Sequence, residues 1–593
     1  MTGWRSLRAL VSAAVSCLAA GPALAEDWEY FVDGTVATSG NGTPDAPWKT
    51  IGEALAAGRA QSGNHAFALR LRVGHIYNTP THDWMLFNQP EDQGDAWQVT
   101  GWFRPGDDDD AVATLATAGG AWGNPRLAPG CEALRVTLGP GVAITSDAGV
   151  PTIYITTSNV SLTLDGCSVT SPSYAVCCTD ATQSVSITIR NGARVASTDN
   201  HAISVASLKS LIVTDSTLTT TGASRYILST GNSPGGISER LQFHRCAVSS
   251  AAGFIHIGWS TTGTVAHYLA QLDLRDNVID IAGIGLAMHR YVRRACIEGN
   301  TFTNRQSGAA GTIVLGFDSG TPADTFATGG IIVRNNLVQN VGSNGGHGIE
   351  IAKGISGAVC SGNTVLDCDY GIVIKGDNVA VDHNCVVSRA ARTLQGACLH
   401  LSGGQGNTLR HNSLYSTIAN SAIEIKKNLE SVMAVNNVVE GNIVHVTNAG
   451  AVCVVVETLP GFDTNRIDGN VYWLSGNARF VANTGNAGGC TYHPTVASLQ
   501  TFWAGCGCWP DNELRSVMAD PRFRAPDQAD LRLIHGSPAC GTRRSFWHNY
   551  GAWQQPESIG DFDDDGDVDM ADFKVFHECF NGPNRPSACC RYE

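Results

Sequence analysis

The chain has 593 residues, of which 43% are hydrophobic and 16% are charged, and it contains 66 glycines. The apolar fraction is too high for a disordered chain, and Glu and Lys are too scarce for a coiled coil or a helical array. The formal net charge is −14 and no basic stretch occurs, so we expect no nucleic-acid partner.

The first 25 residues have the three parts of a secretory signal peptide. Met1–Arg8 is short and basic, Ala9–Ala20 is apolar, and Ala23–Ala25 forms a small-x-small cleavage site. Cys17 could instead mark a lipoprotein site, although the apolar run continues past it. No later window has the roughly 20 apolar residues of a membrane helix. We therefore expect no membrane span and an exported protein, either secreted or held in the periplasm or at the cell surface.

Export changes how the cysteines are interpreted. The chain has 19 cysteines, and Cys17 lies in the signal peptide, which leaves an even number. In an oxidising compartment disulfides are then the default expectation. A zinc site is the alternative for Cys490, His493, Cys506 and Cys508, but one residue between the last two is poor zinc spacing.

From about Val150 to Trp473 one pattern repeats: short runs rich in Val, Ile and Thr with period two, and an Asn at the corner. Such runs indicate strands, and the close-spaced Asn-Gly hairpins of an antiparallel sheet are not seen. The corners are 21 to 36 residues apart, as in a solenoid whose insertions leave as loops. We predict an all-β, right-handed parallel β-helix of about twelve turns, with stacked amides at Asn277, Asn300, Asn336, Asn363, Asn384, Asn412, Asn437 and Asn470.

Both ends of this region carry motifs. Tyr30–Val32, Asn41–Thr43 and Asp45–Ile51, followed by an apolar helix at Ala54–Ala57, resemble the N-terminal motif of secreted pectate-lyase-like β-helix proteins. Asp520–Phe523, Asp530–Leu533 and Gly536–Ala539 resemble the closing segment of the same proteins. The resemblance implies a cap with the first strands at 26–140, the β-helix at 141–475 and a C-terminal cap at 476–556. That group includes polysaccharide lyases, glycoside hydrolases, epimerases and noncatalytic surface proteins, so it implies the architecture and not one chemistry.

Aligning the turns on their inward aliphatic residues places one charged set on a single outward face. Stacked strands lie ~4.8 Å apart, so the set should span roughly 15 Å. Of seven lysines in the chain, four fall within residues 353–427. The set consists of Glu350, Lys375, His400, Glu424 and Lys426, with Lys353, Asp377 and Lys427 at its margin.

Two interpretations fit this set. One is a solvated polar ladder that stabilises little. The other is a groove that binds an acidic polysaccharide and cleaves it by β-elimination, which needs a cation on the uronate carboxylate and a base for the C5 proton. Under the second interpretation Lys375 or Lys426 is the base or carboxylate clamp and His400 is the proton shuttle. Glu350 and Glu424 would then fix the lysines or hold a bridging Ca²⁺.

A glycoside hydrolase is the second possibility, and it needs two carboxyls about 5 to 9.5 Å apart. Glu350 and Glu424 are three turns apart, ~14 Å, which is too far, whereas Glu350 and Asp377 on adjacent turns could fit. His289 and Arg290 either extend the groove or are ordinary surface residues, and His256 is as readily a solvated residue. A noncatalytic glycan-binding or cell-surface protein is the third possibility.

Residues 561–572 form an EF-hand-type loop. Carboxylates occupy positions 1, 3, 5, 9 and 12, Gly566 stands at position 6 for the sharp turn, and position 7 offers its carbonyl. We predict a Ca²⁺ site at Asp561, Asp563, Asp565, Asp567, Asp569 and Asp572. Asp at position 12 resembles the repeat of dockerin modules, which normally carry two such repeats, and residues 557–593 contain one. The single repeat counts against a cohesin-type partner, and a calcium-stabilised tail or a surface-attachment module is the alternative for this segment. We otherwise expect a monomer.

Overall fold

The structure is a computed structural model of the chain. It describes residues 28–78, 85–104, 107–108, 111–117, 125–147, 149–179, 184–230, 236–257, 269–288, 292–305, 311–316, 330–342, 346–389, 396–418, 421–427, 433–448, 450–457, 464–483, 490–506, 512–534, 537–539 and 570. Two compact units are distinguished, residues 1–170 with 184–194 and residues 171–183 with 195–593. The predicted signal peptide lies outside the described residues, and so does the predicted C-terminal helical module with its calcium loop, apart from Met570.

Within the described residues, three sheets of 16 strands contain nearly all of the β-structure. Sheet A consists of β1 (Trp28–Val32), β2 (Ala66–Arg72), β5 (Ala96–Trp102), β8 (Arg135–Leu138), β11 (Ser161–Asp165), β14 (Ser186–Arg190), β17 (Ser207–Thr214), β20 (Gly236–His244), β23 (Gln271–Arg275), β26 (Ala295–Glu298), β29 (Ile331–Arg334), β32 (Val359–Ser361), β35 (Ala380–Asp382), β38 (Thr408–Arg410), β41 (Val438–Glu440) and β44 (Arg466–Asp468). Sheet B consists of β3 (Ile76–Asn78), β6 (Ala113–Thr117), β9 (Val142–Ser146), β12 (Ser168–Ser171), β15 (Arg194–Ser197), β18 (Thr217–Thr220), β21 (Ala247–Ser250), β24 (Val278–Ile281), β27 (Thr301–Asn304), β30 (Leu337–Asn340), β33 (Thr364–Leu366), β36 (Cys385–Ser388), β39 (Ser413–Ser416), β42 (Ile443–Val446), β45 (Val471–Leu474) and β48 (Val517–Met518).

Sheet C carries the residues of the candidate site. It consists of β4 (Leu86–Phe87), β7 (Arg126–Leu127), β10 (Ile153–Ile155), β13 (Val176–Cys178), β16 (Ile203–Val205), β19 (Tyr226–Ser229), β22 (Gly253–Ile257), β25 (Leu286–Met288), β28 (Ile313–Leu315), β31 (His347–Ile351), β34 (Tyr370–Ile374), β37 (Ala397–Ser402), β40 (Ser421–Lys426), β43 (Val452–Glu457), β46 (Arg479–Asn483) and β47 (Cys490–His493). Its strands pair in parallel up to β46, and β47 closes it by pairing antiparallel with β46.

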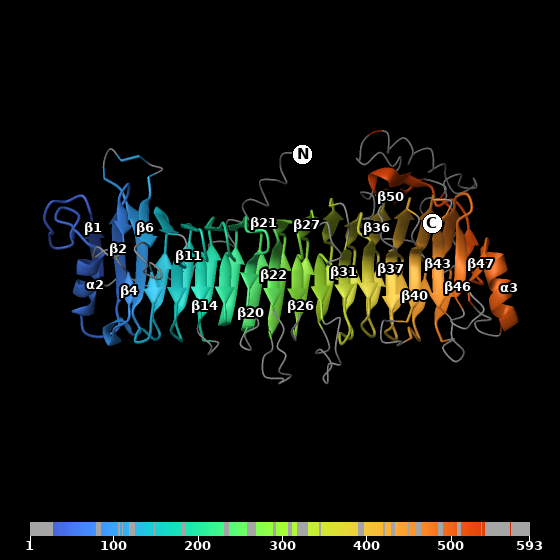
Figure 1. Ribbon diagram of the computed structural model, residues 1–593, viewed down its shortest axis with the longest axis horizontal. Helices are drawn as coiled ribbons and strands as arrows, with labels where there is room; N and C mark the ends of the chain where they lie inside the picture. Colours follow the sequence, from blue (N-terminus) through green and yellow to red (C-terminus); the bar gives the residue numbers. More distant parts are fainter. Residues whose placement is uncertain are drawn as a thin grey trace. The chain divides into compact units, whose positions relative to one another are not determined.

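Each successive turn contributes one strand to each sheet, which is the predicted right-handed parallel β-helix (Figure 1). It has more than the twelve turns expected, because strands from residue 28 onward belong to the same three sheets. The remaining elements are a helix α2 (Ile51–Arg59), a helix α3 (Val496–Cys506), two short 3₁₀ helices (Pro90–Asp92 and Pro526–Gln528) and the antiparallel pair β49 (Phe523–Ala525) and β50 (Asp530–Leu533). No helix in the described part of the chain is long and apolar enough to span a membrane.

In the first unit, α2 starts with a reciprocal cap. The Thr50 hydroxyl accepts from the Glu53 backbone N–H at 3.3 Å, and the Glu53 carboxylate accepts from the Thr50 N–H at 3.0 Å. The helix packs closely at Gly58, where an added Cβ would lie 2.6 Å from the Trp97 ring. Trp97 is buried and stacks on Phe67 with centroids 4.5 Å apart. A helix therefore covers the first aromatic layer of this unit.

In the second unit, buried asparagines form the predicted ladder. Each amide Nδ2 donates to the Oδ1 of the next asparagine at 2.8 to 3.0 Å, so these polar groups are satisfied without water. The members are Asn277, Asn300, Asn336, Asn363, Asn384, Asn412, Asn442 and Asn470. The prediction was wrong at one position: Asn437 belongs to a second, shorter run with Asn407 and Asn465, and Asn442 takes its place.

Eleven described cysteines form no disulfide, which corrects the disulfide expectation for them. They are Cys131, Cys167, Cys177, Cys178, Cys246, Cys296, Cys360, Cys368, Cys385, Cys398 and Cys453. A disulfide needs Cα atoms about 4.4 to 6.8 Å apart. Cys398 and Cys453 share one position of sheet C, but Ala422 lies between them, which separates them by two strand spacings, ~9.6 Å. Burial in the solenoid, as small apolar groups, is the role that the structure gives most of them.

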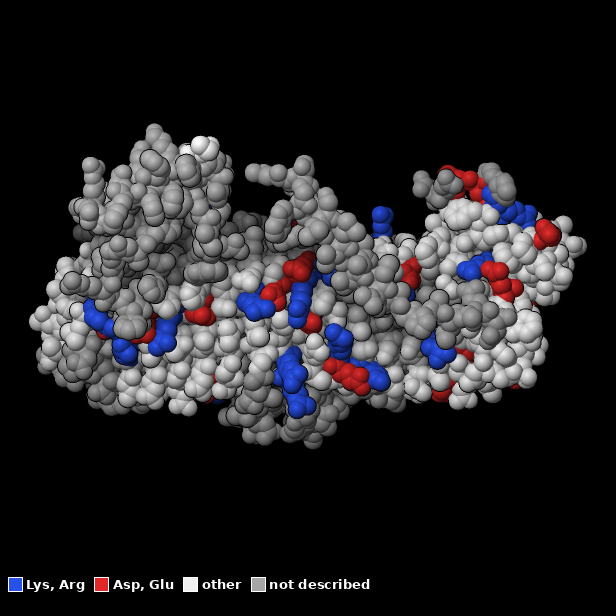
Figure 2. Space-filling view, turned by 180° about the vertical axis from the view of Figure 1, so that it is seen from behind, with Lys and Arg blue, Asp and Glu red and all other residues white. Residues whose placement is uncertain are grey.

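Ion pairs between neighbouring turns hold many of the charged side chains. Examples are Arg190 with Asp165 at 2.7 Å, Arg334 with Glu298 at 2.8 Å and Arg410 with Glu440 at 2.9 Å. On the face that Figure 2 presents, acidic and basic side chains lie together in small mixed groups.

Candidate functional site

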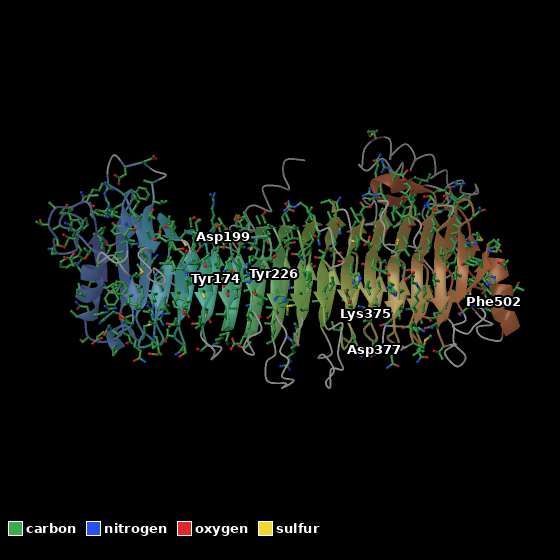
Figure 3. All side chains as sticks on the ribbon, in the orientation of Figure 1. Tyr174, Asp199, Tyr226, Lys375, Asp377 and Phe502 are labelled. Atoms are coloured by element: carbon green, nitrogen blue, oxygen red, sulfur yellow. The ribbon has the colours of Figure 1, made fainter. Side chains whose placement is uncertain are left out.

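The register of sheet C brings the predicted residues together. Glu350 on β31 pairs with Val373 on β34, Val373 with His400 on β37, and His400 with Glu424 on β40. Because side chains alternate along a strand and the residues one position earlier are buried inside the solenoid, Glu350, Val373, His400 and Glu424 face outward. The buried residues are Ile349, Ile372, Leu399 and Ile423. Lys426 is the register partner of Ser402, and Lys375 directly follows β34 (Figure 3). We call Glu350, Lys375, His400, Glu424 and Lys426 the charged cluster.

Glu350 is buried and fully paired. The Lys375 Nζ donates to its Oε1 at 2.6 Å, and the His347 Nδ1 donates to its Oε2 at 2.5 Å. Only 5% of the Glu350 side chain and 15% of the Lys375 side chain are exposed. Burial alone raises the pKa of Glu350, but the hydrogen bond and charge of His347, together with Lys375, outweigh it and lower the pKa to about 2. This carboxylate is therefore ionised at any physiological pH.

His400 is held in its neutral form. Burial, then the positive charges of Lys426, His347 and Lys375, lower the pKa of His400 to about 3. Its ring stacks on that of Tyr370, with centroids 4.9 Å apart and 27° between the planes. Burial and the nearby Glu424 raise the pKa of Tyr370, so its hydroxyl stays protonated. Neutral imidazole and neutral phenol thus lie side by side between the two lysines.

Glu424 and Lys426 form the second ion pair of the cluster. The Lys426 Nζ lies 3.0 Å from Oε1 of Glu424, and 36% of the lysine side chain is exposed against 7% of the glutamate. Oε2 of Glu424 lies 3.9 Å from Nε2 of His400 and has no hydrogen-bond partner among the described residues. Lys426 is therefore the more accessible of the two cluster lysines, and Glu424 keeps an unused acceptor beside His400.

The predicted marginal residues lie in the turns. The Asp377 carboxylate accepts from the backbone N–H of Gln405 at 2.8 Å, which gives it a structural role in the turn after β34 (Figure 3). Lys427 pairs with Glu457 at 3.4 Å, and Lys353 is half-buried two residues after β31. His289 and Arg290, the predicted extension of the groove, lie outside the described residues.

Burial corrects one interpretation of the charged set. Glu350 and Glu424 are 3% and 5% exposed as whole residues, which does not fit a solvated ladder. Sequence reasoning also missed His347 and Tyr370, which begin β31 and β34 and complete the cluster. Both are three residues before an outward position, and this regular offset was the signal that could have found them.

A bridging metal does not fit the two glutamates. They are three strands apart in the register, ~14 Å, which is too far for one ion. Among the described residues, no group of three or more His, Cys, Asp or Glu side chains is arranged to hold a metal. The predicted calcium ligands, Asp561 to Asp572, lie outside this part of the chain.

The fold defines the chain as a parallel β-helix protein with a buried, charged cluster on one outward face. Comparison with protein-family models gives no match, and comparison with curated proteins gives none either. The chemistry of the cluster itself must carry the functional argument.

Proposed function

We propose that the charged cluster binds an acidic polysaccharide and cleaves it by β-elimination. The observation that carries this proposal is a neutral histidine, His400, held between two lysine–glutamate pairs on stacked strands. The two lysines and two glutamates cancel in formal charge. A bound uronate therefore meets an accessible cation without a local excess of negative charge, although the chain as a whole is acidic.

Lys426 is the carboxylate clamp in this proposal, because it is the more exposed lysine. Its charge neutralises the uronate carboxylate and so makes the C5 proton more acidic. Lys375, which is tied to buried Glu350, is a positioning residue: its charge helps to keep His400 neutral. Of the two roles that the sequence left open between the lysines, this proposal gives the clamp to Lys426 and moves the base to His400.

His400 accepts the C5 proton, the electron pair of the C5–H bond forms the C4–C5 double bond, and the C4–O glycosidic bond breaks. The leaving oxygen takes a proton from Tyr370. A pKa of about 3 makes free His400 a weak base. A substrate carboxylate bound to Lys426 offsets one of the charges that lower this pKa, so the basicity of His400 rises when substrate is bound.

No observation favours the hydrolase. Glu350 and Glu424 are three strands apart, and a carboxyl with a pKa of about 2 cannot act as a general acid near neutral pH. Asp377, the other candidate partner of Glu350, is engaged with the backbone of Gln405.

The same proposal has three further parts: export by the signal peptide, a Ca²⁺ ion in the loop from Asp561 to Asp572, and attachment through residues 557–593 to a cohesin-like or cell-surface partner. They rest on the sequence motifs alone.

The test is ultraviolet absorbance of unsaturated uronate on pectic, alginate and glycosaminoglycan polymers with Ca²⁺ added. We expect a rising signal that falls at least about a hundredfold in Lys426→Met and His400→Asn. Lys209→Met and His383→Asn are matched controls, because Lys209 is an exposed residue of β17 in sheet A and His383 lies in the turn between β35 and β36.

A flat trace on every polymer would refute the lyase. New reducing ends without absorbance would instead establish a hydrolase, and binding without new ends would establish a glycan-binding protein.

A further inference from the structure

A second cluster of rings lies on sheet C, at the strands β16, β19 and β22. These strands precede β31 to β40, which carry the charged cluster. His201 lies two residues before β16, Tyr226 begins β19, and His256 lies in β22. The ring centroids of His201 and Tyr226 are 6.0 Å apart, and those of Tyr226 and His256 are 4.9 Å apart. All three side chains are half-buried. We call these three residues the neutral ring cluster.

This cluster repeats the geometry found at the charged cluster. Tyr226 stacks on His256 at 4.9 Å and 27°, the same values as for Tyr370 and His400. In both pairs the tyrosine begins a strand of sheet C and the histidine lies on the next strand, three register positions further along. His201 and His347 occupy the same register position, one turn before the tyrosine, but the rings meet differently: His201 is stacked on Tyr226 at 29°, whereas His347 meets Tyr370 edge-on at 87°. The sheet thus carries the Tyr–His stack twice, each time with a histidine one turn before the tyrosine.

The two copies differ in charge. The outward positions in register with His256 hold Ser204, Ser229, Ala287 and Val314, none of which is charged. Along this line the acids Glu350 and Glu424 stand at the second copy. Asp199 lies in the turn before β16 (Figure 3), and Arg225 lies in the turn before β19.

The rings of the first copy offer neutral hydrogen-bonding groups. Burial, followed by the charge of Arg225, lowers the pKa of His201 to about 4, and burial lowers the pKa of His256. The Nδ1 of His201 accepts from the backbone N–H of Tyr226 at 2.9 Å, which leaves the proton on Nε2. Burial raises the pKa of Tyr226, so its phenol keeps its proton. Uncharged donors and acceptors of this kind suit sugar hydroxyls, whereas none of the three rings offers a carboxylate a positive charge in place of its hydration.

We infer that the neutral ring cluster is a second sugar subsite, which takes uncharged residues of the same polysaccharide whose uronate occupies the charged cluster. His256 and His400, the proposed base, share one outward line of sheet C and are five strand spacings apart, ~24 Å, so an extended chain several sugars long reaches both. The substrate class that fits is a polymer in which uronates alternate with neutral sugars, rather than a polymer of uronate alone. This inference rests on the proposed polysaccharide binding, but not on catalysis.

Affinity electrophoresis of the full chain tests it, with gels that contain hyaluronan, rhamnogalacturonan, polygalacturonate or alginate. Uronates alternate with uncharged sugars in the first two, and every residue is a uronate in the last two. We expect tighter binding to one of the alternating polymers, and about a tenfold loss of that affinity in Tyr226→Phe and in His256→Asn, each of which removes one or two hydrogen bonds. His383→Asn is the matched control, because it removes a histidine from a turn outside sheet C.

Salt provides a second readout. The contribution of Lys426 is screened by salt, whereas that of the neutral rings is not, so the loss in His256→Asn should persist at high salt. Binding of an alternating polymer that both ring variants weaken supports the inference even if no unsaturated product forms. Cleavage of a uronate-only polymer with unchanged affinity in both ring variants overturns the inference and leaves the proposed lyase standing. Failure of every polymer to bind overturns both.

Discussion

The pairing of Glu350 with Lys375 predicts a large and strongly coupled loss of stability when either partner is removed. The pKa of Glu350 is about 2 against 4.5 for the free side chain, which corresponds to about 3 kcal/mol of stability at neutral pH. Because the pKa is lowered in the folded state, this contribution is present above pH 4.5 and is lost as the pH falls toward 2. Glu350→Gln also leaves the Lys375 ammonium, 15% exposed, without its carboxylate, a situation that costs about 3 to 5 kcal/mol.

A double-mutant cycle with Lys375→Met measures this by chemical denaturation at pH 7 and pH 3. At pH 7 we expect Glu350→Gln to lose about 3 kcal/mol or more, and the double variant to lose about 2 kcal/mol less than the sum of the single variants. At pH 3 the loss in Glu350→Gln should shrink. Asp215→Asn is the control, because Asp215 and Arg245 form an exposed ion pair at 2.7 Å and such pairs contribute less than about 1 kcal/mol. Losses that add to within about 0.5 kcal/mol would refute the buried, coupled pair.

Three further predictions concern the ladder, the last turns and the calcium loop. Asn336→Ala removes four side-chain hydrogen bonds at 2.8 to 3.0 Å. At about 1 kcal/mol or more for each bond, denaturant unfolding should show a loss of at least about 4 kcal/mol. A loss below about 1 kcal/mol would contradict the ladder. Burial raises the pKa of Glu513 to about 7, so the stability that its protonated form contributes is fully present below pH 4.5 and is lost as the pH rises through 7. Glu513→Gln should therefore remove about 3 kcal/mol of the change in unfolding free energy with pH. An unchanged dependence of unfolding free energy on pH would contradict this. Chelation of Ca²⁺ should speed hydrogen exchange in peptides from residues 557–593 but not in β37, and equal rates with and without the ion would exclude the site at Asp561–Asp572.

The fold could be predicted because its signals are local and repeated. Strand alternation recurs along the solenoid and corner asparagines recur from Asn277 onward, where the side-chain amides bond to the turns before and after them. The error at Asn437 has a physical cause: Asn437 and Asn442 stand five residues apart on the two sides of β41, and both are buried in amide runs. Variable turn lengths cannot show which of two such residues continues a given run. The strands before residue 140 were undercounted since they lack those corners.

The sequence predicted the residues of the charged cluster only where the alternation of inward and outward side chains along a strand determines their position. Positions 350, 400 and 424 follow from counting alternate residues inward and outward, and the structure places them in one line. The neighbours His347 and Tyr370 begin their strands, where the chain turns a corner and the in-and-out rule no longer applies. Burial could not be predicted either, because Glu350 is covered by side chains from its own and the next turn, His347 and Lys375.

The parallel β-helix explains why such a site can be strongly electrostatic without a deep cavity. Each outward side chain has neighbours ~4.8 Å away on the turns before and after it, so two or three long side chains suffice to bury a carboxylate. Val314 and Val373 lie on either side of Glu350 in its line, and Val455 follows Glu424, so apolar groups lie on both sides of the first acid and on one side of the second. In such surroundings the charges of Lys375 and Lys426 act on His400 with little screening by water, and its pKa falls. At the first ring set Ser204 and Ala287 stand in place of the acids, and burial, with the charge of Arg225 at His201, lowers the pKa of His201 and His256. In our proposal, similar Tyr–His stacks therefore serve a charged sugar at one place and an uncharged sugar at the other.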